Sequence, residues 1–360
     1  MSRRLEQIAS CRDALLKDYP DMASRATAIR ESAVANLPAL AEKAKQSLTG
    51  KKCIVYQAKD KAEAATILRS ILQNQEQVVR TYSKTLREIG FDELMSAQGT
   101  VVNLSRIEEI VWAGQGSPFL GHPRLPQWDL SPQEIEAALR KFVSFQGEVS
   151  PKRLKETVYR RIKEDILRCG YGITSADSVV AENGVLVLPE DEGDGRAVSN
   201  LPYHHVAVAG LDKLTWLAED AVTLAQTTAV YGMGRNTPNY CSLIAGPSRT
   251  ADIEFRMAYG MHGPKEVHVI LLDNGRSALR DQGLGGLLKC IDCGSCYGEC
   301  AALAAKCKWS EVVLTPKGMA LGLVQGRLAP LSSALAMSDF VCPVGLDAKG
   351  VVDMLTQVKC

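Results

Sequence analysis

The C-terminal part of the chain is organised around Cys290-Ile291-Asp292-Cys293-Gly294-Ser295-Cys296-Tyr297-Gly298-Glu299-Cys300. Its four cysteines are separated by two, two and three residues, which is a spacing that bacterial ferredoxins use. A cubane iron-sulfur cluster needs thiolates that converge from one tight loop, and the two glycines of the run permit such a loop. The run therefore predicts an iron-sulfur site.

The fourth ligand is expected to be Cys342, because Cys342-Pro343 is the kind of pair that completes a cluster begun by such a run. In two-cluster ferredoxins more cysteines precede this pair, but residues 335 to 340 contain none. Cys300 is the alternative fourth ligand, and Cys307 and Cys360 are expected to be free thiols. We therefore predict one [4Fe-4S] cluster with four ligands: Cys290, Cys293, Cys296 and Cys342.

One alternative is a zinc site, and another is a set of buried thiols. Zinc usually takes two separate Cys-x2-Cys pairs, whereas this run puts three sulfurs on one side of a loop, which favours an iron-sulfur cluster. The chain has 11 cysteines, and seven of them lie between residues 290 and 360. In a chain of 360 residues this concentration indicates metal binding in a reducing compartment.

Length and composition indicate a globular protein. A chain of 360 residues with 46% hydrophobic content can form two domains, or one large domain with an appendage. Its 42 Lys and Arg nearly balance its 41 Asp and Glu, so no net field attracts a polyanion, and nucleic-acid binding is not expected. No apolar segment approaches the ~20 residues that span a bilayer, and the first five residues do not resemble a signal peptide. We expect a cytoplasmic protein without a transmembrane segment.

Strand and helix patterns alternate after Lys52, which predicts a parallel sheet covered by helices. An amphipathic helical segment, residues 1–48, precedes this region and is expected to cover the sheet. Asp60 with Glu63, and Ser131 with Glu134, are predicted capping boxes at two helix starts. The expected strands are residues 53–56, 77–82, 100–102, 172–174, 179–181, 185–188, 205–209 and 267–272, and the expected helices are residues 83–95, 152–169 and 214–228, with a Pro/Gly-rich connection at 117–126.

Two segments between the strands are expected to carry function. Near Gly246-Pro247 a strand should end and a helix should open beside Arg249, offering free N–H groups to an anion. Residues 171–210 combine glycine turns with polar side chains at strand ends, which predicts a crevice for a ligand; ordinary turns with solvated charges are the alternative. From Ser277 a helix is expected to lead into the cysteine run. The polar side chains of the crevice are Glu182, Arg196, His204 and His205.

Several ordered segments resemble the lactate-utilisation (LUD) domain. They are residues 170–196, 201–210, Gly246-Pro-Ser-Arg-Thr-Ala-Asp-Ile-Glu254, Gly260-Met-His-Gly-Pro-Lys-Glu266 and residues 271–276. With the cysteine run after them, the chain from about residue 50 resembles the iron-sulfur subunit of the bacterial lactate-utilisation system. The resemblance implies an α/β fold of the ribose-5-phosphate isomerase and CoA-transferase type. It is a Rossmann-like open sheet with helices on both faces, followed by a helical ferredoxin-like segment.

The resemblance also implies a role in oxidising L-lactate to pyruvate, together with a cysteine-rich iron-sulfur partner subunit and a second LUD protein. It divides the chain into a helical lead-in (1–48), a LUD α/β domain (49–276) and a helical [4Fe-4S]-binding domain (277–360). The chain departs from the family pattern in its degraded second cysteine motif. A path through two clusters is therefore expected to be reduced to one cluster.

A small 2-hydroxy or 2-oxo acid needs cations for its carboxylate and a base for its hydroxyl proton. Arg196 and Arg249 are the candidate cations, and His204 or His262 is the candidate base. No Gly-x-Gly-x-x-Gly follows the first strand, so a nicotinamide or flavin site is not expected. A cubane cluster passes one electron at a time, so a partner must supply the two-electron acceptor.

The sequence is also compatible with two other functions. Ala181-Glu182-Asn183-Gly184 is similar to the segment in which CoA-transferases carry their nucleophilic glutamate, so Glu182 is a candidate for forming an acyl anhydride. The other is an iron-sulfur relay or sensor without turnover.

Overall fold

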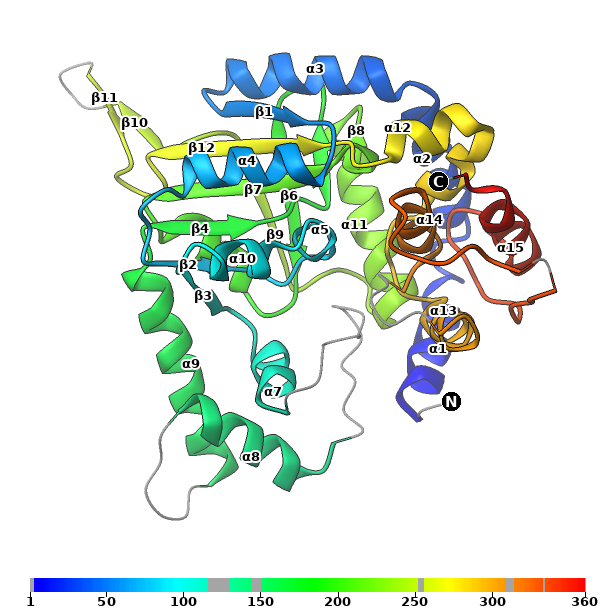
Figure 1. Ribbon diagram of the computed structural model, residues 1–360, viewed down its shortest axis with the longest axis horizontal. Helices are drawn as coiled ribbons and strands as arrows, with labels where there is room; N and C mark the ends of the chain where they lie inside the picture. The colour runs from blue at the N-terminus through cyan, green and yellow to red at the C-terminus, as the bar shows by residue number, and fades with distance from the viewer. Residues whose placement is uncertain are drawn as a thin grey trace.

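The computed structural model describes residues 3–115, 130–143, 150–251, 256–308, 314–332 and 334–359 (Figure 1). The helices are α1 (Arg3–Leu15), α2 (Met22–Ala35), α3 (Leu37–Gly50), α4 (Lys61–Ile71), α5 (Lys84–Glu88), α6 (Phe91–Ser96), α7 (Ile107–Gln115), α8 (Pro132–Phe142), α9 (Pro151–Arg168), α10 (Asp194–Asn200), η1 (Leu211–Lys213), α11 (Ala218–Met233), α12 (Arg276–Leu279), η2 (Arg280–Leu284), η3 (Gly285–Lys289), α13 (Tyr297–Lys306), α14 (Pro316–Val324) and α15 (Ala348–Gln357). The strands are β1 (Ile54–Ala58), β2 (Gln77–Arg80), β3 (Val101–Leu104), β4 (Tyr171–Thr174), β5 (Ser178–Val180), β6 (Val185–Glu190), β7 (His204–Gly210), β8 (Leu214–Thr215), β9 (Tyr240–Ile244), β10 (Arg249–Ala251), β11 (Met257–Tyr259) and β12 (Glu266–Leu272).

The central sheet of the described chain has six strands in the order β1-β12-β7-β4-β2-β3, and every neighbouring pair is parallel. The chain runs outward from β2 to β3, then returns to β4 and continues through β7 and β12 in the other direction. The carboxyl ends of β2 and β4 therefore meet where the winding reverses, and ligands of open α/β sheets bind at such a point.

Alternating side chains of the strands pack against helices on both faces of the sheet. In β7, Ala207 and Ala209 belong to one apolar core with α2 and α3, whereas Val206 and Val208 belong to another with α4 and α6. This alternation follows from the two-residue period of a strand. The helices of the N-terminal segment thus cover one face of the sheet.

The C-terminal helices lie beyond the carboxyl ends of the strands. Figure 1 shows α12, α13, α14 and α15 at the side toward which β12 and β7 point. The largest apolar core contains residues of α2, of the central sheet and of the C-terminal helices as far as Leu355 in α15. The C-terminal helices therefore pack against the same core as the sheet. The three-part division of the chain stays a prediction.

Two smaller sheets accompany the central one. Strands β8, β5, β6 and β9 form a mixed sheet in that order, and β10 pairs with β11 in an antiparallel hairpin. In Figure 1 this hairpin lies at the amino ends of the central strands, on the opposite side of the molecule from the C-terminal helices.

Several helix starts agree with the prediction. Ser131 and Glu134 form the capping box of α8, and the side chain of Asp60 accepts a hydrogen bond from the Glu63 N–H at 2.9 Å. Glu63 itself accepts from the N–H of Lys59, so the second half of that predicted box is shifted by one residue. Helix α9 occupies nearly the range predicted for it.

Four predicted helices were wrong in extent or type. The helix expected over 83–95 is divided into α5 and α6, because Gly90 adopts a left-handed conformation with φ of 67°. The helix expected from Leu214 begins at Ala218, after the short strand β8. The helix expected beside Arg249 is strand β10, so the predicted helical anion site does not form there. From Ser277 helical segments do lead into the cysteine run, but only the part up to Leu279 is α-helical, and η2 and η3 follow it to Lys289.

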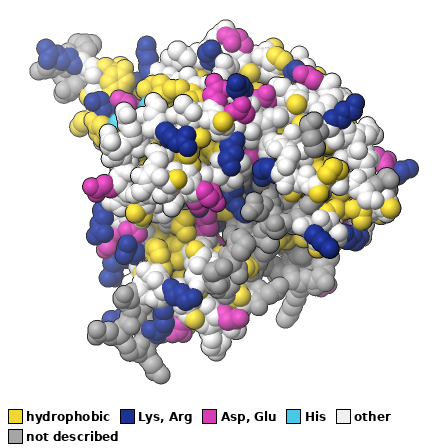
Figure 2. Space-filling view, viewed as in Figure 1, with side chains coloured by type: hydrophobic (Ala, Val, Ile, Leu, Met, Phe, Trp, Pro, Cys, Tyr) yellow, Lys and Arg dark blue, Asp and Glu magenta, His cyan; other side chains and the backbone are white. Residues whose placement is uncertain are grey.

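Basic and acidic side chains are interspersed over the face that Figure 2 shows. In the described chain no helix has the length and apolarity needed to cross a bilayer. The connection expected at 117–126 lies outside the described residues.

Candidate functional site

The cysteine run forms a loop between η3 and α13. Asp292 and Gly294 have φ of 57° and 92°, and these left-handed residues turn the chain sharply. Helix α11 packs directly against the loop, because a Cβ atom at Gly232 would lie only 2.0 Å from the carbonyl oxygen of Cys293. The Ser295 hydroxyl donates a hydrogen bond to the carbonyl of Tyr231 at 2.7 Å. The loop is therefore held rigidly by the end of α11.

Four cysteines from two distant segments line one cavity. Its empty volume is about 310 Å³, including the part open to solvent. Thr315, Pro316 and Phe340 complete its wall. In the described part of the chain, no three of the cysteine sulfurs lie within 4.8 Å of one another. The cysteines that line the cavity are Cys290, Cys293, Cys296 and Cys342.

Cys300 is fully buried but is not among the residues that line this cavity. Its sulfur lies 3.6 Å from the sulfur of Cys296, close enough for the Cys300 thiol to donate a hydrogen bond to it. Cys300 therefore contacts the cavity residue Cys296 without lining the cavity itself.

Burial raises the pKa of the cavity thiols. The pKa of Cys290 is raised to about 12 by burial and by Asp292, and that of Cys293 to about 12 by burial and by Cys296. Burial also raises the pKa of Cys342 to about 11. The contact with Cys300 and burial raise the pKa of Cys296. Such thiols become thiolates only when a bound cation compensates their charge, so this donor set fits a metal or iron-sulfur centre.

A larger pocket adjoins the cysteine loop at the carboxyl edge of the central sheet. Its empty volume is about 1090 Å³, including open solvent. The segments after β2, β4, β7 and β12 all contribute to its wall, as the reversal of the strand order between β2 and β4 favours. Asp292 of the cysteine loop and Lys317 of α14 also line it. The pocket is therefore shared by the sheet and the C-terminal segment.

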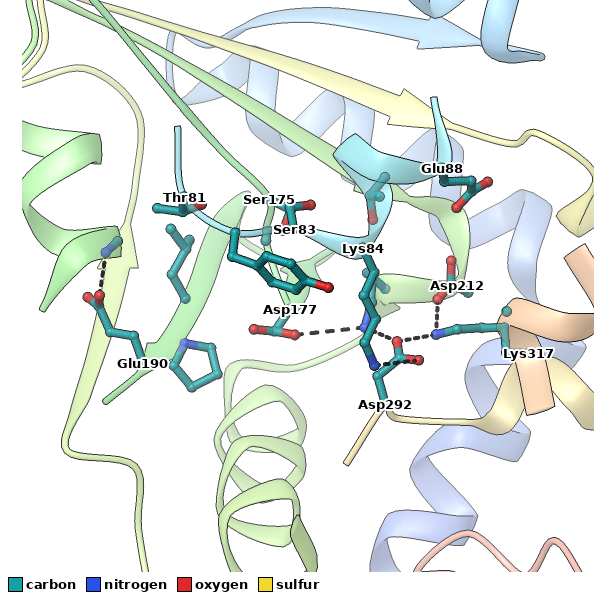
Figure 3. A pocket seen from close by; sticks show the side chains of 18 of the residues that line it. Thr81, Ser83, Lys84, Glu88, Ser175, Asp177, Glu190, Asp212, Asp292 and Lys317 are labelled. Carbon is teal, nitrogen blue, oxygen red and sulfur yellow. Dashed lines mark hydrogen bonds and ion pairs between the residues drawn. The ribbon is translucent and has the colours of Figure 1, made fainter. Parts of the chain in front are cut away.

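Three lysines converge on Asp292 at one end of this pocket, and Figure 3 labels two of them, Lys84 and Lys317. The Lys213 and Lys317 ammonium groups lie 2.7 and 2.6 Å from Oδ2 of Asp292, and that of Lys84 lies 3.6 Å from Oδ1. Burial alone would raise the pKa of Asp292, but Lys213 and Lys317 lower it well below its usual range. Burial lowers the pKa of Lys84, and Asp292 opposes that effect. The ionised carboxylate of Asp292 thus connects the cysteine loop to the lysines that line the pocket.

A second layer of buried charges supports this end. Asp212 accepts hydrogen bonds from Arg276 and from Lys317, the latter at 2.5 Å, and Arg276 also pairs with Glu88 at 2.9 Å. Burial opposes ionisation of Asp212, yet Lys317 and Arg276 hold its pKa well below the usual value. These pairs connect α5, η1, α12 and α14.

Carboxyl groups line the other end of the pocket. Burial and the nearby Asp194 raise the pKa of Glu190, which lines this end, to about 7. Glu192 is not among the lining residues, but burial and a hydrogen bond to Glu108 raise its pKa to about 8. Glu190 lies across the pocket from the lysines in Figure 3. A carboxyl group with this pKa is suited to general acid-base chemistry near neutral pH.

The five side chains predicted from the sequence as catalytic are not among those that line this pocket. Glu182 is exposed in the turn between β5 and β6, where Ser47 of α3 donates a hydrogen bond to its carbonyl oxygen at 3.1 Å. Arg196 is exposed on α10, and only its backbone N–H contacts Glu190, at 2.7 Å.

The other three lie toward the amino ends of the strands. Arg249 is exposed on β10, and the N–H of the exposed His262 donates to the hydroxyl of Ser248 at 3.1 Å. His204 begins β7, and its Nδ1 lies 3.2 Å from a carboxylate oxygen of Glu266. The predicted carboxylate clamp of Arg196 and Arg249 is thus not brought together at the carboxyl-edge pocket.

Sequence reasoning missed Lys84, Lys213, Glu190 and Lys317. Lys84 and Lys213 follow shortly after the carboxyl ends of β2 and β7, which is a position that the parallel-sheet prediction makes significant. Lys317 does not follow a strand of the sheet, because it belongs to the C-terminal segment, so its position in the sequence does not mark it as a pocket residue. Only the folded chain places it beside Asp212.

Comparisons with known proteins identify related sequences. The LUD domain family matches residues 41–272. The chain is 27% identical over 290 residues to the uncharacterized electron transport protein YkgF of Escherichia coli, covering 80% of this chain and 59% of that protein. It is 25% identical to lactate utilization protein B of Macrococcus caseolyticus, covering 79% and 58%, and 23% identical to that of Bacillus subtilis, covering 95% and 71%.

A solved structure of a DUF162 family protein from Deinococcus radiodurans shares 14% identity with the chain, with a TM-score of 0.36, covering 66% of this chain and 98% of that one. The chain spans less than three fifths of the length of the Escherichia coli and Macrococcus caseolyticus relatives. The family match extends from α3 through β12, which includes the whole central sheet. The chain belongs to the LUD domain family.

Proposed function

We propose that this chain is an iron-sulfur electron-transfer protein of an L-lactate-oxidising system, with one [4Fe-4S] cluster at Cys290, Cys293, Cys296 and Cys342. The observation that carries the proposal is that these four side chains, from segments 46 residues apart at their nearest, line one cavity. The names of the relatives, which refer to electron transport and lactate utilization, support the same function.

The spacing of the sulfurs favours a cluster over a zinc ion. Four thiolates bound at about 2.3 Å to a tetrahedral zinc ion lie about 3.8 Å apart. In the described chain no three cysteine sulfurs lie within 4.8 Å of one another, so the sulfurs are not placed as a closed zinc tetrahedron requires. A cubane cluster, which is larger than one ion, fits such a cavity.

The chemistry requires partners. Oxidation of L-lactate to pyruvate releases two electrons and two protons, whereas a bound [4Fe-4S] cluster passes one electron at a time. A cysteine-rich iron-sulfur subunit and a second LUD protein are the proposed partners, and one of them supplies the two-electron acceptor. This chain would contribute a one-electron carrier next to the carboxyl-edge pocket.

We place the substrate acid in the carboxyl-edge pocket. Lys84 and Lys213 present ammonium groups to a small 2-hydroxy or 2-oxo acid, whose carboxylate they would pair with. Glu190, with its pKa raised to about 7 by burial, is positioned to accept the hydroxyl proton. The partner's two-electron acceptor would take the C2 hydrogen with its electron pair and would then pass the electrons one at a time to the cluster. Asp292 lines the pocket and belongs to the loop that carries the proposed ligands Cys290 and Cys293.

The ligand assignment is tested by comparing two cysteine variants. Cys342→Ser should lose most of the iron and sulfide of the anaerobically purified protein, because it removes a cavity ligand. Cys300→Ser should retain them, because Cys300 lies outside the cavity, and Cys307→Ser provides a second cysteine control. Iron loss in Cys300→Ser with full retention in Cys342→Ser would reverse the assignment.

A further inference from the structure

A second group of metal-ligating side chains lies at the amino edge of the central sheet, away from the cysteines. His204 begins β7 and is paired in register with Glu266, the first residue of β12. Side chains two residues apart on a strand share a face, so His268 projects beside Glu266. Two imidazoles and one carboxylate therefore meet on one face of two neighbouring strands.

The distances between these groups match the edges of a zinc tetrahedron. Nδ1 of His204 and Nε2 of His268 lie 3.2 and 3.5 Å from the same carboxylate oxygen, Oε2 of Glu266. Two ligand atoms that each lie about 2.1 Å from a tetrahedral zinc ion are about 3.4 Å apart. All three ligand atoms lie within 4.8 Å of one another, as no other group of three or more His, Cys, Asp or Glu does in the described chain.

Both nitrogens are buried and lack a hydrogen bond within the described structure, although each is near the Glu266 oxygen. His268 is only 7% exposed, so its Nε2 cannot be satisfied by bulk water. A buried ring nitrogen without a hydrogen-bond partner destabilises the folded chain. A cation between the three groups would satisfy both nitrogens at once.

The surroundings hold the two rings in the orientation that a metal needs. The other nitrogen of His268, Nδ1, lies 3.4 Å from the hydroxyl of Tyr56, which is the kind of outer contact that orients metal-bound histidines. The His204 ring stacks on Tyr171 with centroids 4.4 Å apart and an angle of 11° between the planes. Glu266 has a side chain 43% exposed, so solvent reaches this side of the group.

We propose that His204, Glu266 and His268 bind one zinc ion, with a fourth position open to water or a small ligand. Two imidazoles and one carboxylate with an open position form a donor set used by zinc enzymes. The site joins β7 to β12 at the edge of the sheet opposite the cysteine cavity. It does not depend on the proposed iron-sulfur function.

The experiment adds zinc chloride to the iron-loaded full-length protein under anaerobic conditions and measures the zinc X-ray absorption spectrum after removal of excess metal. We expect one zinc per chain with nitrogen and oxygen neighbours at about 2.0–2.1 Å. A sulfur shell at about 2.3 Å would place the zinc in the cysteine cavity and would overturn the proposal.

Three variants locate the ion. His268→Gln and Glu266→Gln each remove one ligand and should weaken zinc binding more than about 100-fold, because loss of an outer-shell partner alone costs 10–100-fold. Tyr56→Phe removes the outer contact and should weaken it about tenfold. His262→Gln is the matched control, because this exposed histidine lies outside the group, and it should bind zinc as the wild type does.

Iron content and the thermal unfolding midpoint show that each variant is folded. Glu266→Gln alters a half-exposed side chain, so it keeps the test valid if His268→Gln does not fold. Unchanged zinc affinity in Glu266→Gln, or no zinc uptake by the wild type, would mean that the three side chains form only a His-Glu-His ion-pair cluster.

Discussion

Lys84 opens helix α5 just after strand β2, where it lines the carboxyl-edge pocket and faces Asp292. If the substrate carboxylate binds there, Lys84→Met should weaken binding of L-lactate or pyruvate by about 1.5–3 kcal/mol, as for one hydrogen bond to a charged group. Isothermal titration of both acids measures this change, and iron content should remain that of the wild type.

Arg249→Met provides the opposing arm of this test, since the sequence predicts Arg249 as a carboxylate ligand and the folded chain places it on β10. Our placement of the substrate requires that the Arg249 variant bind both acids with unchanged affinity. Weaker binding in the Arg249 variant, together with normal binding in the Lys84 variant, would move the substrate site to the amino edge.

His205 makes the stability of the protein depend on pH. It is fully buried in β7, its Nε2 lies 2.8 Å from the hydroxyl of Thr174, and burial lowers its pKa to about 3. The unfolded chain binds a proton below about pH 6.5 while the folded chain does not, so this contribution to stability is complete above that pH. It is lost at about 1.4 kcal/mol per pH unit as the pH falls from about 6.5 toward 3.

Between pH 7 and pH 5 the wild type should therefore lose about 2 kcal/mol more unfolding free energy than His205→Gln, which cannot take up this proton. Urea unfolding at the two pH values measures the difference. His262→Gln should follow the wild type, because that side chain is exposed. Equal pH dependence in the wild type and His205→Gln would show that His205 does not carry this effect.

Lys317 connects helix α14 to Asp212, which follows strand β7, and to the cysteine loop. Its buried ammonium group lies 2.5 Å from Asp212, 2.6 Å from Asp292 and 3.0 Å from the carbonyl oxygen of Cys290. Lys317→Met should lower the free energy of unfolding by about 3 kcal/mol, because it leaves buried carboxylates with fewer cations. Urea denaturation measures the loss.

Lys349→Met is the matched control, since Lys349 is an exposed lysine on the neighbouring helix α15. Its unfolding free energy should change by less than about 0.5 kcal/mol. A similarly small change in Lys317→Met would mean that Arg276 and Lys213 alone compensate the two carboxylates.

Elements with a strong local signal were predictable from the sequence. The apolar run of β12 and the Ser131 cap of α8 have that signal, because period and capping chemistry are local. The prediction of one continuous helix over 83–95 was wrong, because no residue near Gly90 in the sequence indicates that Gly90 adopts a left-handed conformation. Beside Arg249 the apparent helix start forms a hairpin, because pairing with Met257–Tyr259 overrides local preference.

The cysteine cavity and the carboxyl-edge pocket also differ in how far local sequence predicts them. The cysteine loop is contiguous in sequence, and Cys342-Pro343 has a recognisable form, so a shared cavity could be predicted. The pocket combines Lys84, Glu190, Lys213 and Lys317, which are far apart in the chain and meet only through the order of the strands. The sequence therefore indicates the cysteine cavity better than the carboxyl-edge pocket.

At the scale of the whole molecule, the central sheet has a different site at each edge. The carboxyl edge holds the pocket and the cysteine cavity, and Asp292 of the cysteine loop lines the pocket. The amino edge holds the His204, Glu266 and His268 group. The C-terminal helices share the largest core with the sheet, so the cavity and the pocket are held in a fixed relation.

The proposed function requires that Cys290, Cys293, Cys296 and Cys342 hold one [4Fe-4S] cluster. Chemical determination of iron and acid-labile sulfide in the anaerobically purified protein tests it most directly, with zinc measured on the same sample. We predict about four irons and about four sulfides per chain, and after reduction the EPR signal of one isolated cluster. About eight irons per chain, or zinc at the cysteines without sulfide, would contradict it.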